Sequence, residues 1–156
     1  MEELYRQYNE WLLKLAYRLT GDWELAADVV HDVFAKIISD GENFQNVNSA
    51  KNWLAKSVCN RALDYKRLAW YKLKGYLEDS ERWQVVFQRS YEEQDAIARI
   101  LKKLTAKERA VLVLRDKEGY SVKEIAAMLN IKENTVRVLS KTGRDKFISC
   151  YRKEIK

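Results

Sequence analysis

The side chains best suited to chemistry lie near the C-terminus, where charged and amide groups recur at helical spacing. They would share one outward face of a helix: Lys132, Glu133, Asn134, Thr135, Arg137, Val138, Lys141 and Arg144. Lysine and arginine bind DNA phosphates, whereas amides, carboxylates, hydroxyls and methyl groups discriminate base edges. The set predicts a helix that reads duplex DNA, with base contacts near its start and phosphate contacts further along.

A helix-turn-helix needs particular residues behind such a face, and the sequence supplies them. Ala126 is small enough for the crossing of two helices, Ile131 can fill the turn, and Val136 can anchor the second helix. Ser121 and Glu124 have the capping-box pattern that begins a short first helix. The alternative to a DNA-binding helix-turn-helix is an amphipathic helical hairpin whose charged outer face is only solvated.

Two more helices are expected before this hairpin, and the last helix is expected over about 132–151. One runs over about 94–104, and the other begins at a second capping box, Thr105 to Glu108, and stops at Gly119. Gly143 falls inside the last helix, where glycine costs about 1 kcal/mol relative to alanine. We therefore expect the recognition helix to be weakened near that position.

The N-terminal part predicts three helices, over about 2–20, 22–39 and 50–67 or beyond. Asp22 and Ser49 are suitable N-caps for the second and third. The chain contains no proline and only five glycines, the two residue types that helix interiors exclude. Three such helices can bury a small common core. The fold class is therefore all-α, with two small helical domains.

Between the two helical groups, residues 68–93 predict a linker with partial helix, which leaves domains at 1–67 and 94–156. The aromatic residues of the linker are scattered among charges, and only Trp83 and Phe87 have a clear helical spacing. They are expected to dock on a flanking domain or, less commonly, on a partner.

The net charge of +6 is unevenly distributed. Residues 1–67 hold nine basic against ten acidic side chains, and residues 68–93 hold four against five. Residues 94–156 hold sixteen against eight, a surplus of +8. Such a local excess is typical of a polyanion-binding surface, although a lysine-rich solvated surface has the same composition.

Other residues exclude several classes of protein. Cys59 and Cys150 are far apart and form no metal-binding pattern, so they predict buried thiols in a reducing cytoplasm and neither a metal nor a cofactor. No apolar run reaches a membrane span, and the start lacks the basic segment of a signal peptide. One histidine, His31, and no glycine-rich phosphate loop argue against an enzyme with a small-molecule substrate.

Several short segments, in order, match one known family. They are residues 16–22, 27–34, 52–54 and 60–67 in the N-terminal part, and 104–109, 124–126 and 135–137 in the C-terminal part. In their order and spacing these segments make the chain resemble the extracytoplasmic-function group of the sigma-70 family of RNA polymerase initiation factors.

The resemblance implies two domains, region 2 over 1–67 and region 4 over 94–156. It implies an alternative sigma factor that binds the β′ clamp and β flap of core RNA polymerase and reads the −10 and −35 elements of promoter DNA. An anti-sigma factor is a further implied partner. The residues implied to contact polymerase lie on the second helix: Asp28, Val29, His31, Asp32 and Lys36. Acidic residues near a helix N-terminus are also explained without a partner, because they interact favourably with the helix dipole.

The same resemblance implies that the loop before the third helix, and that helix, open and read the −10 element. The implied contacts are Asn46, Asn48, Lys51, Asn60, Lys66 and Arg67. Amides and a basic track suit an unpaired strand. Asp64 would orient neighbouring basic groups, and Trp53 could stack on a base or, as is more common, belong to the core.

The chain departs from the family pattern at a few positions. Thr105 stands where proline is usual, Ser140 where leucine is common, and Thr142 and Gly143 where arginine and alanine are usual. The change at Thr142 removes one expected phosphate contact. The alternative function is a helix-turn-helix transcriptional regulator that is not a sigma factor, whose N-terminal domain would sense or dimerise.

Overall fold

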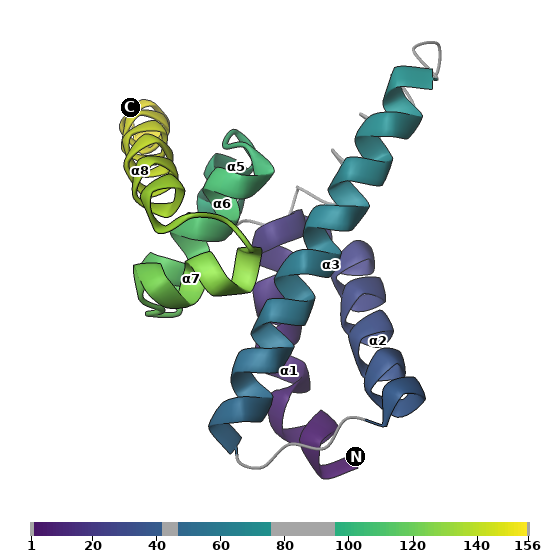
Figure 1. The fold of residues 1–156 in the computed structure, drawn as a ribbon. Helices are drawn as coiled ribbons and strands as arrows, with labels where there is room; N and C mark the ends of the chain where they lie inside the picture. The colour runs from purple at the N-terminus through teal and green to yellow at the C-terminus, as the bar shows by residue number, and fades with distance from the viewer. Residues whose placement is uncertain (1, 42–46, 76–95, 156) are drawn as a thin grey trace.

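The structure is a computed structural model that describes the backbone of residues 2–41, 47–75 and 96–155; within these ranges, the side chains of 47–48, 66–75 and 155 are not described. Every element in these ranges is helical (Figure 1), which confirms the all-α prediction. In the same part of the chain, no helix is both long and apolar enough to cross a membrane.

The first three helices form a bundle. They are α1 (Glu2–Thr20), α2 (Trp23–Asp40) and α3 (Val47–Gly75). Each packs against the other two, because each carries an apolar stripe at helical spacing. Asp22 caps α2 as predicted, with its carboxylate accepting the Glu24 N–H at 2.8 Å.

The third helix begins earlier than the sequence predicts and, as the prediction allowed, continues beyond residue 67. It begins at Val47, so Asn48 and Ser49 lie inside it, and the prediction that Ser49 is its N-cap is wrong. It ends at Gly75, eight residues into the predicted linker, because no glycine or proline interrupts 68–74. Residues 76–95, with the linker aromatics Trp83 and Phe87, lie outside the described residues.

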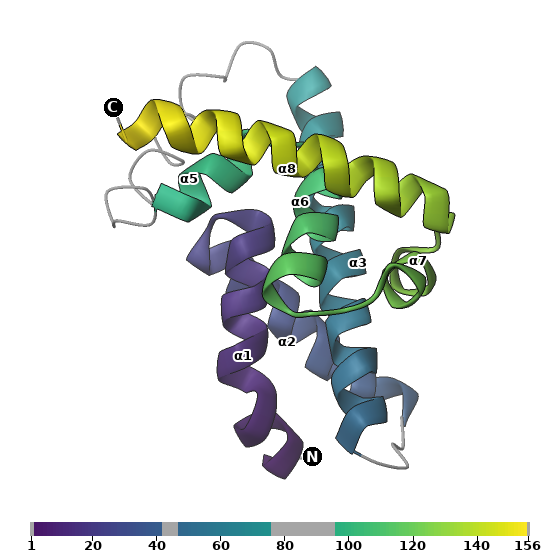
Figure 2. The same ribbon diagram turned by 90° about the vertical axis from the view of Figure 1, so that its left-hand side faces the viewer.

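The second group comprises α5 (Ala96–Lys102), α6 (Ala106–Leu112), a π-helical turn η1 (Val113–Lys117), α7 (Val122–Leu129) and α8 (Glu133–Ile155). The long helix α8 lies across α5, α6 and α7 (Figure 2). It extends to Ile155, beyond its predicted end near residue 151.

The two predicted capping boxes have different outcomes. Ser121 and Glu124 form theirs completely at the start of α7. Thr105 accepts the Glu108 N–H at 3.2 Å, which forms the first half of the second box. The Glu108 carboxylate also forms a tertiary ion pair, in which its Oε1 accepts from Lys146 of α8 at 2.8 Å.

Gly143 has a packing role that sequence alone does not reveal. It is buried, and a Cβ there would lie 3.3 Å from the carbonyl oxygen of Glu108 and 3.5 Å from Leu104. The glycine lets α8 cross α6 at close range, and α8 continues unbroken through it. The helix-propensity cost at this position is offset by close packing.

The two helical groups share one continuous buried cluster, which extends from Leu12 of α1 to Val136 of α8. At its centre lies Arg109 of α6, only 3% exposed. Its guanidinium donates to the carbonyl oxygen of Leu19 at 2.6 Å and of Leu101 at 2.7 Å. Arg109 thus bonds the C-terminal ends of α1 and α5 together, and burial lowers its pKa only to about 10.

A second polar network joins α2 to α3. Asp32 accepts the Tyr65 hydroxyl at 2.6 Å and both Nε and Nη2 of Arg61, at 3.1 and 3.0 Å. The Arg61 guanidinium also lies 4.7 Å from the centre of the Tyr65 ring. The Tyr65 hydrogen bond, helped by Arg61, lowers the pKa of Asp32 below its ordinary value.

Replacing Gly143 should test the close helix crossing. Gly143→Val should lower the free energy of unfolding by about 1–3 kcal/mol, because the added methyl groups push α8 away from α6. Ser149→Val places the same side chain at an exposed position of α8 and should cost much less. Equal losses in urea unfolding would mean that β-branching, not the crossing, explains the effect.

The Asp32 network should make the N-terminal bundle sensitive to acid. A lowered pKa means that Asp32 stabilises the fold above its ordinary pKa of 3.8 and loses that contribution as pH falls through the folded-state value. Asp32→Asn should cost about 1 kcal/mol at neutral pH, and the difference from the unmodified protein should shrink in acid. Unfolding measured against pH checks this, and a difference that stays constant into acid would contradict the role of the Asp32 carboxylate.

Candidate nucleic-acid interface

The α7–α8 pair has the packing that a helix-turn-helix requires. Ala126 is 8% exposed and Val136 is fully buried, and both belong to the core. Asn130 adopts the left-handed conformation, and the Ile131 N–H returns to the Ala126 carbonyl at 3.0 Å. The turn between the helices is therefore fixed by backbone bonds as well as by packing.

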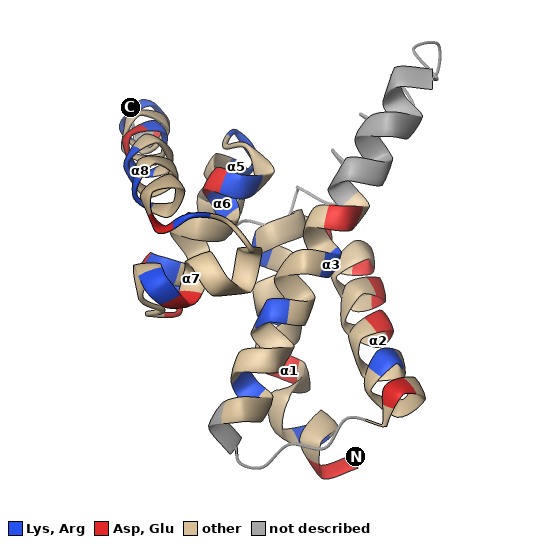
Figure 3. Cartoon of the chain, viewed as in Figure 1, with Lys and Arg blue, Asp and Glu red and all other residues tan. Residues whose placement is uncertain are grey.

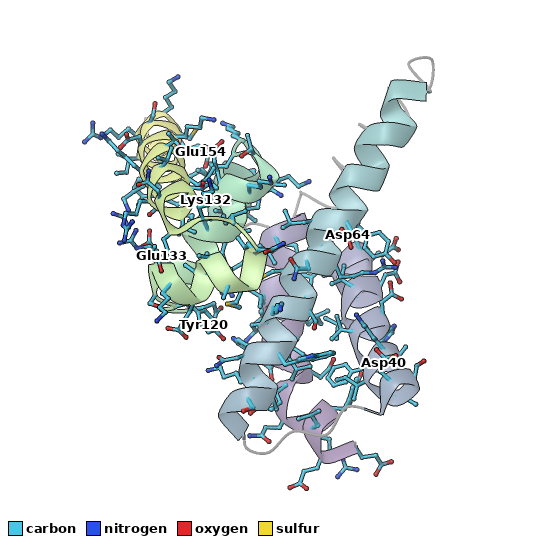
Figure 4. The ribbon with its side chains drawn as sticks, in the orientation of Figure 1. Asp40, Asp64, Tyr120, Lys132, Glu133 and Glu154 are labelled. Carbon is cyan, nitrogen blue, oxygen red and sulfur yellow. The ribbon has the colours of Figure 1, made fainter. Side chains whose placement is uncertain are left out.

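All eight residues predicted to face DNA are exposed, from Lys132 at the start of α8 to Arg144. Figure 4 shows Lys132 and Glu133 on the opposite side of the molecule from Asp40 and Asp64. Glu133 pairs with Arg137 at 3.6 Å, which holds that arginine along the outward face. The structure thus brings the predicted duplex-reading set together on one accessible surface.

Further along α8, three side chains bond within the protein. Arg144 pairs with Asp116 at 2.8 Å, so a phosphate contact by Arg144 would compete with that carboxylate. The Thr142 hydroxyl donates to the Val138 carbonyl at 3.0 Å. Ser140, where the family pattern has leucine, is buried and accepts Arg115 at 3.1 Å. The Ser140 hydroxyl can be buried at this site because Arg115 donates a hydrogen bond to it.

The predicted −10 set is only partly described. Lys51 is exposed, with its ammonium 5.1 Å from the centre of the Trp11 ring, and Asn60 is half-buried. The Asn60 amide donates to the carbonyl of Met128 in α7 at 3.1 Å, a contact between the two helical groups. The remaining predicted residues lie outside the described positions or have undescribed side chains: Asn46, Asn48, Lys66 and Arg67.

The predicted polymerase surface on α2 needs one correction. Val29 is fully buried in the bundle, so it cannot contact a partner; its place in the apolar stripe of α2 was missed. Asp28, His31 and Lys36 are exposed, and acidic side chains are spaced along the outer side of α2 (Figure 3). Asp32 is half-buried, and its carboxylate is engaged by α3.

An open groove of about 640 Å³ lies between α2 and α3, next to these residues. Its lining mixes apolar surface with side chains of both charges, and includes Asp32, Lys36, Trp53, Lys56, Asn60 and Asp64. Trp53 is half-buried: one part packs against the core, and the ring also forms part of the groove wall. Both predicted roles of Trp53 remain open to it.

Sequence reasoning missed the polar residues that join helices to one another, although a signal existed for the network within the N-terminal group. Arg61 and Tyr65 have i, i+4 spacing on α3, which would place both toward one acceptor. Arg109 gave no such signal, because its acceptors are backbone carbonyls that no side-chain pattern encodes.

Two family models match the chain. The model described as Sigma-70 region 2 matches residues 4–71, and the one described as Sigma-70, region 4 matches residues 94–146. Together they cover more than half of the sequence.

Named relatives agree with these models. The ECF RNA polymerase sigma factor SigE of Mycolicibacterium smegmatis is 31% identical over 151 residues, which are 92% of this chain and 58% of that protein. The ECF RNA polymerase sigma factor SigM of Mycobacterium tuberculosis is 30% identical, over 87% of this chain and 69% of that one. The chain thus spans under two thirds of SigE and slightly more than two thirds of SigM.

A solved structure supports the fold. The chain is similar to the structure of the sigma factor RpoE in complex with the anti-sigma factor NepR from Bartonella quintana, with a TM-score of 0.72 and 18% identity over 97% of this chain and 98% of that one. At this identity the likeness concerns the fold alone. With the family models and the named relatives, it leads to one assignment: the chain belongs to the extracytoplasmic-function group of the sigma-70 family.

Proposed function

We propose that this chain is an alternative sigma factor, which binds core RNA polymerase and directs it to promoters through −10 and −35 contacts. Its proposed domains are region 2 over 1–67, a linker over 68–93, and region 4 over 94–156. The observation that carries the proposal is the pairing of an exposed helix-turn-helix face with an N-terminal bundle of the region 2 family. A plain DNA-binding regulator has no need of that bundle.

The proposed −35 contact uses the outward face of α8. Base edges are read near its start, by Glu133, Asn134 and Thr135, and phosphates by the cations that follow. Lysine and arginine gather on this helix (Figure 3). All of these side chains are exposed, so duplex DNA could reach them without rearrangement of α8.

The proposed −10 and polymerase contacts use the N-terminal bundle. Asp28, His31 and Lys36 form an exposed, mixed-charge face on α2 that suits a polar partner surface such as the β′ clamp. Asn60 and Lys51 of α3 would meet the unpaired strand. Each contact alone can be weak, because polymerase binds both domains and links their DNA contacts into one bivalent interaction.

We further propose an anti-sigma factor as a partner. The similar Bartonella quintana sigma factor was solved in complex with one, and this chain matches that sigma factor over almost its whole length.

The decisive experiment is reconstituted transcription with core RNA polymerase from the same host. Promoter-specific initiation that depends on this chain would establish the sigma function. Tight binding to a selected duplex, without polymerase binding or initiation, would establish the helix-turn-helix regulator instead.

Charge reversal on α8 should separate the two domains' roles. Arg137→Glu with Lys141→Glu should weaken binding to a selected −35 duplex at least about fivefold, because two phosphate or base contacts are lost. Binding to core polymerase in pull-down should be retained. Lys153→Glu, also exposed on α8 but outside the predicted face, is the matched control. Loss of polymerase binding together with DNA binding would refute this division of labour.

Charge reversal on α2 should act in the opposite way. Asp28→Lys with Lys36→Glu should reduce core polymerase binding, while duplex binding stays unchanged. Asp32 is left intact, since its replacement would also break the α2–α3 network. Glu10→Lys, an exposed reversal on α1, serves as control. Undiminished polymerase capture by the α2 variant would show that this face is not the docking surface.

A further inference from the structure

Arg144 already binds an oxyanion within the protein. Its Nη2 donates to Oδ1 of Asp116 at 2.8 Å, and its Nε donates to Oδ2 of the same carboxylate at 3.3 Å. A DNA phosphate would use the same edge of the guanidinium, because carboxylate and phosphate both present two oxygens to an arginine. Asp116 therefore occupies the donors of a side chain that the sequence places among the DNA contacts.

The position of the Asp116 carboxylate is fixed by its own element. Asp116 lies in the π-helical turn η1, which the fully buried Leu114 anchors in the core. The residue before it, Arg115, donates to the buried Ser140 hydroxyl at 3.1 Å. Ser140 and Arg144 are one helical turn apart on α8, so two consecutive residues of η1 bond two neighbouring positions of one α8 face. The carboxylate is thus held beside α8 by more than its ion pair.

The other cations of the predicted duplex-reading face are held differently. Arg137 pairs at 3.6 Å with Glu133, which belongs to the same helix and the same face. Lys132 and Lys141 form no ion pair within the described part of the chain. Among these cations, Arg144 is therefore the one whose carboxylate partner, in the described ranges, comes from another element. That partner offsets the positive charge of the face at one defined point.

We propose that Asp116 is a specificity-determining residue of this face, because it takes the place of a DNA phosphate on Arg144 until a phosphate lies within reach of the guanidinium. The side chains of Arg144 and Asp116 are 48% and 43% exposed, so water and salt screen the ion pair and a phosphate can replace the carboxylate. The proposal rests on the duplex-reading part of the sigma function proposed above, and it assigns a role to a residue outside the predicted contact set.

The exchange of partners separates well-placed from poorly placed duplex. A duplex bound in its preferred register presents one phosphate to Arg144, and this phosphate replaces the carboxylate. In other registers the phosphates lie elsewhere, and Arg144 stays with Asp116. Complexes without sequence recognition depend almost wholly on phosphate contacts, so the loss of one contact weakens them most. Specificity then comes from a penalty on the wrong complexes as well as from base contacts in the right one.

Replacing the carboxylate should weaken this discrimination. Asp116→Asn keeps the size of the side chain and frees Arg144 for any phosphate. At about 0.1 M salt, affinity for a random-sequence duplex pool should rise about fivefold, and affinity for a duplex selected by the unmodified chain about twofold or less. The logarithm of the random-pool affinity should also fall more steeply with the logarithm of salt concentration, by about 0.9, because one more counterion is released. Fluorescence anisotropy on the full chain measures both quantities.

Asp145→Asn is the matched control. It removes the same charge from the position next to Arg144 on α8, and Asp145 is exposed and forms no ion pair within the described residues. This change should leave the salt slope, and the ratio of the two affinities, close to those of the unmodified chain. Arg144→Gln is the second control. In its background Asp116→Asn has no cation to free and should change neither quantity.

Three outcomes would overturn the proposal. The first is equal behaviour of Asp116→Asn and Asp145→Asn. The second is a gain that persists with Arg144→Gln, which would mean that Asp116 repels DNA without acting through the arginine. The third is an equal gain on the random pool and on the selected duplex, which would leave Asp116 no role in specificity. Failure of the unmodified chain to recover any duplex by selection, although it unfolds cooperatively in urea, would instead refute the duplex-reading function itself.

Discussion

The arrangement of the whole molecule depends on one buried cation bonded to helix ends. Arg109 has lost nearly all contact with water, and its guanidinium donates to carbonyls at the C-termini of α1 and α5. These carbonyls have no partners within their own helices, and the helix dipole makes such ends attractive to a cation. One side chain of region 4 therefore satisfies the end of a region 2 helix and fixes the meeting point of the two groups.

The same principle recurs at a second polar contact between the groups. Asn60 of α3 bonds a terminal carbonyl of α7, as Arg109 bonds one of α1. Each group thus supplies a side chain that donates to a terminal carbonyl of a helix in the other group. Such bonds are modest in net free energy, since water satisfies the same carbonyls when the groups separate. An interface built on them can be specific in geometry and still open.

The sequence predicted what local periodicity and capping determine. The apolar stripes located the helices, and Asp22, Thr105 and Ser121 began theirs as expected. The exposed face of α8 also followed from spacing alone. Local patterns could not show what tertiary contacts decide: Val29 belongs to the core, and the Glu108 carboxylate forms an ion pair with Lys146 of α8. The sequence predicted that Gly143 weakens α8, whereas in the structure this glycine permits the close crossing of α8 and α6.

The packing of the two groups leaves the two predicted DNA-binding surfaces unequally exposed. The start of α8 is exposed, whereas Asn60 of α3 is half-buried against α7. A ligand could therefore contact the start of α8 without rearrangement, whereas a ligand of the Asn60 amide would have to compete with the Met128 carbonyl. The +8 surplus of residues 94–156 acts over a longer range than any of these bonds and favours the first contact.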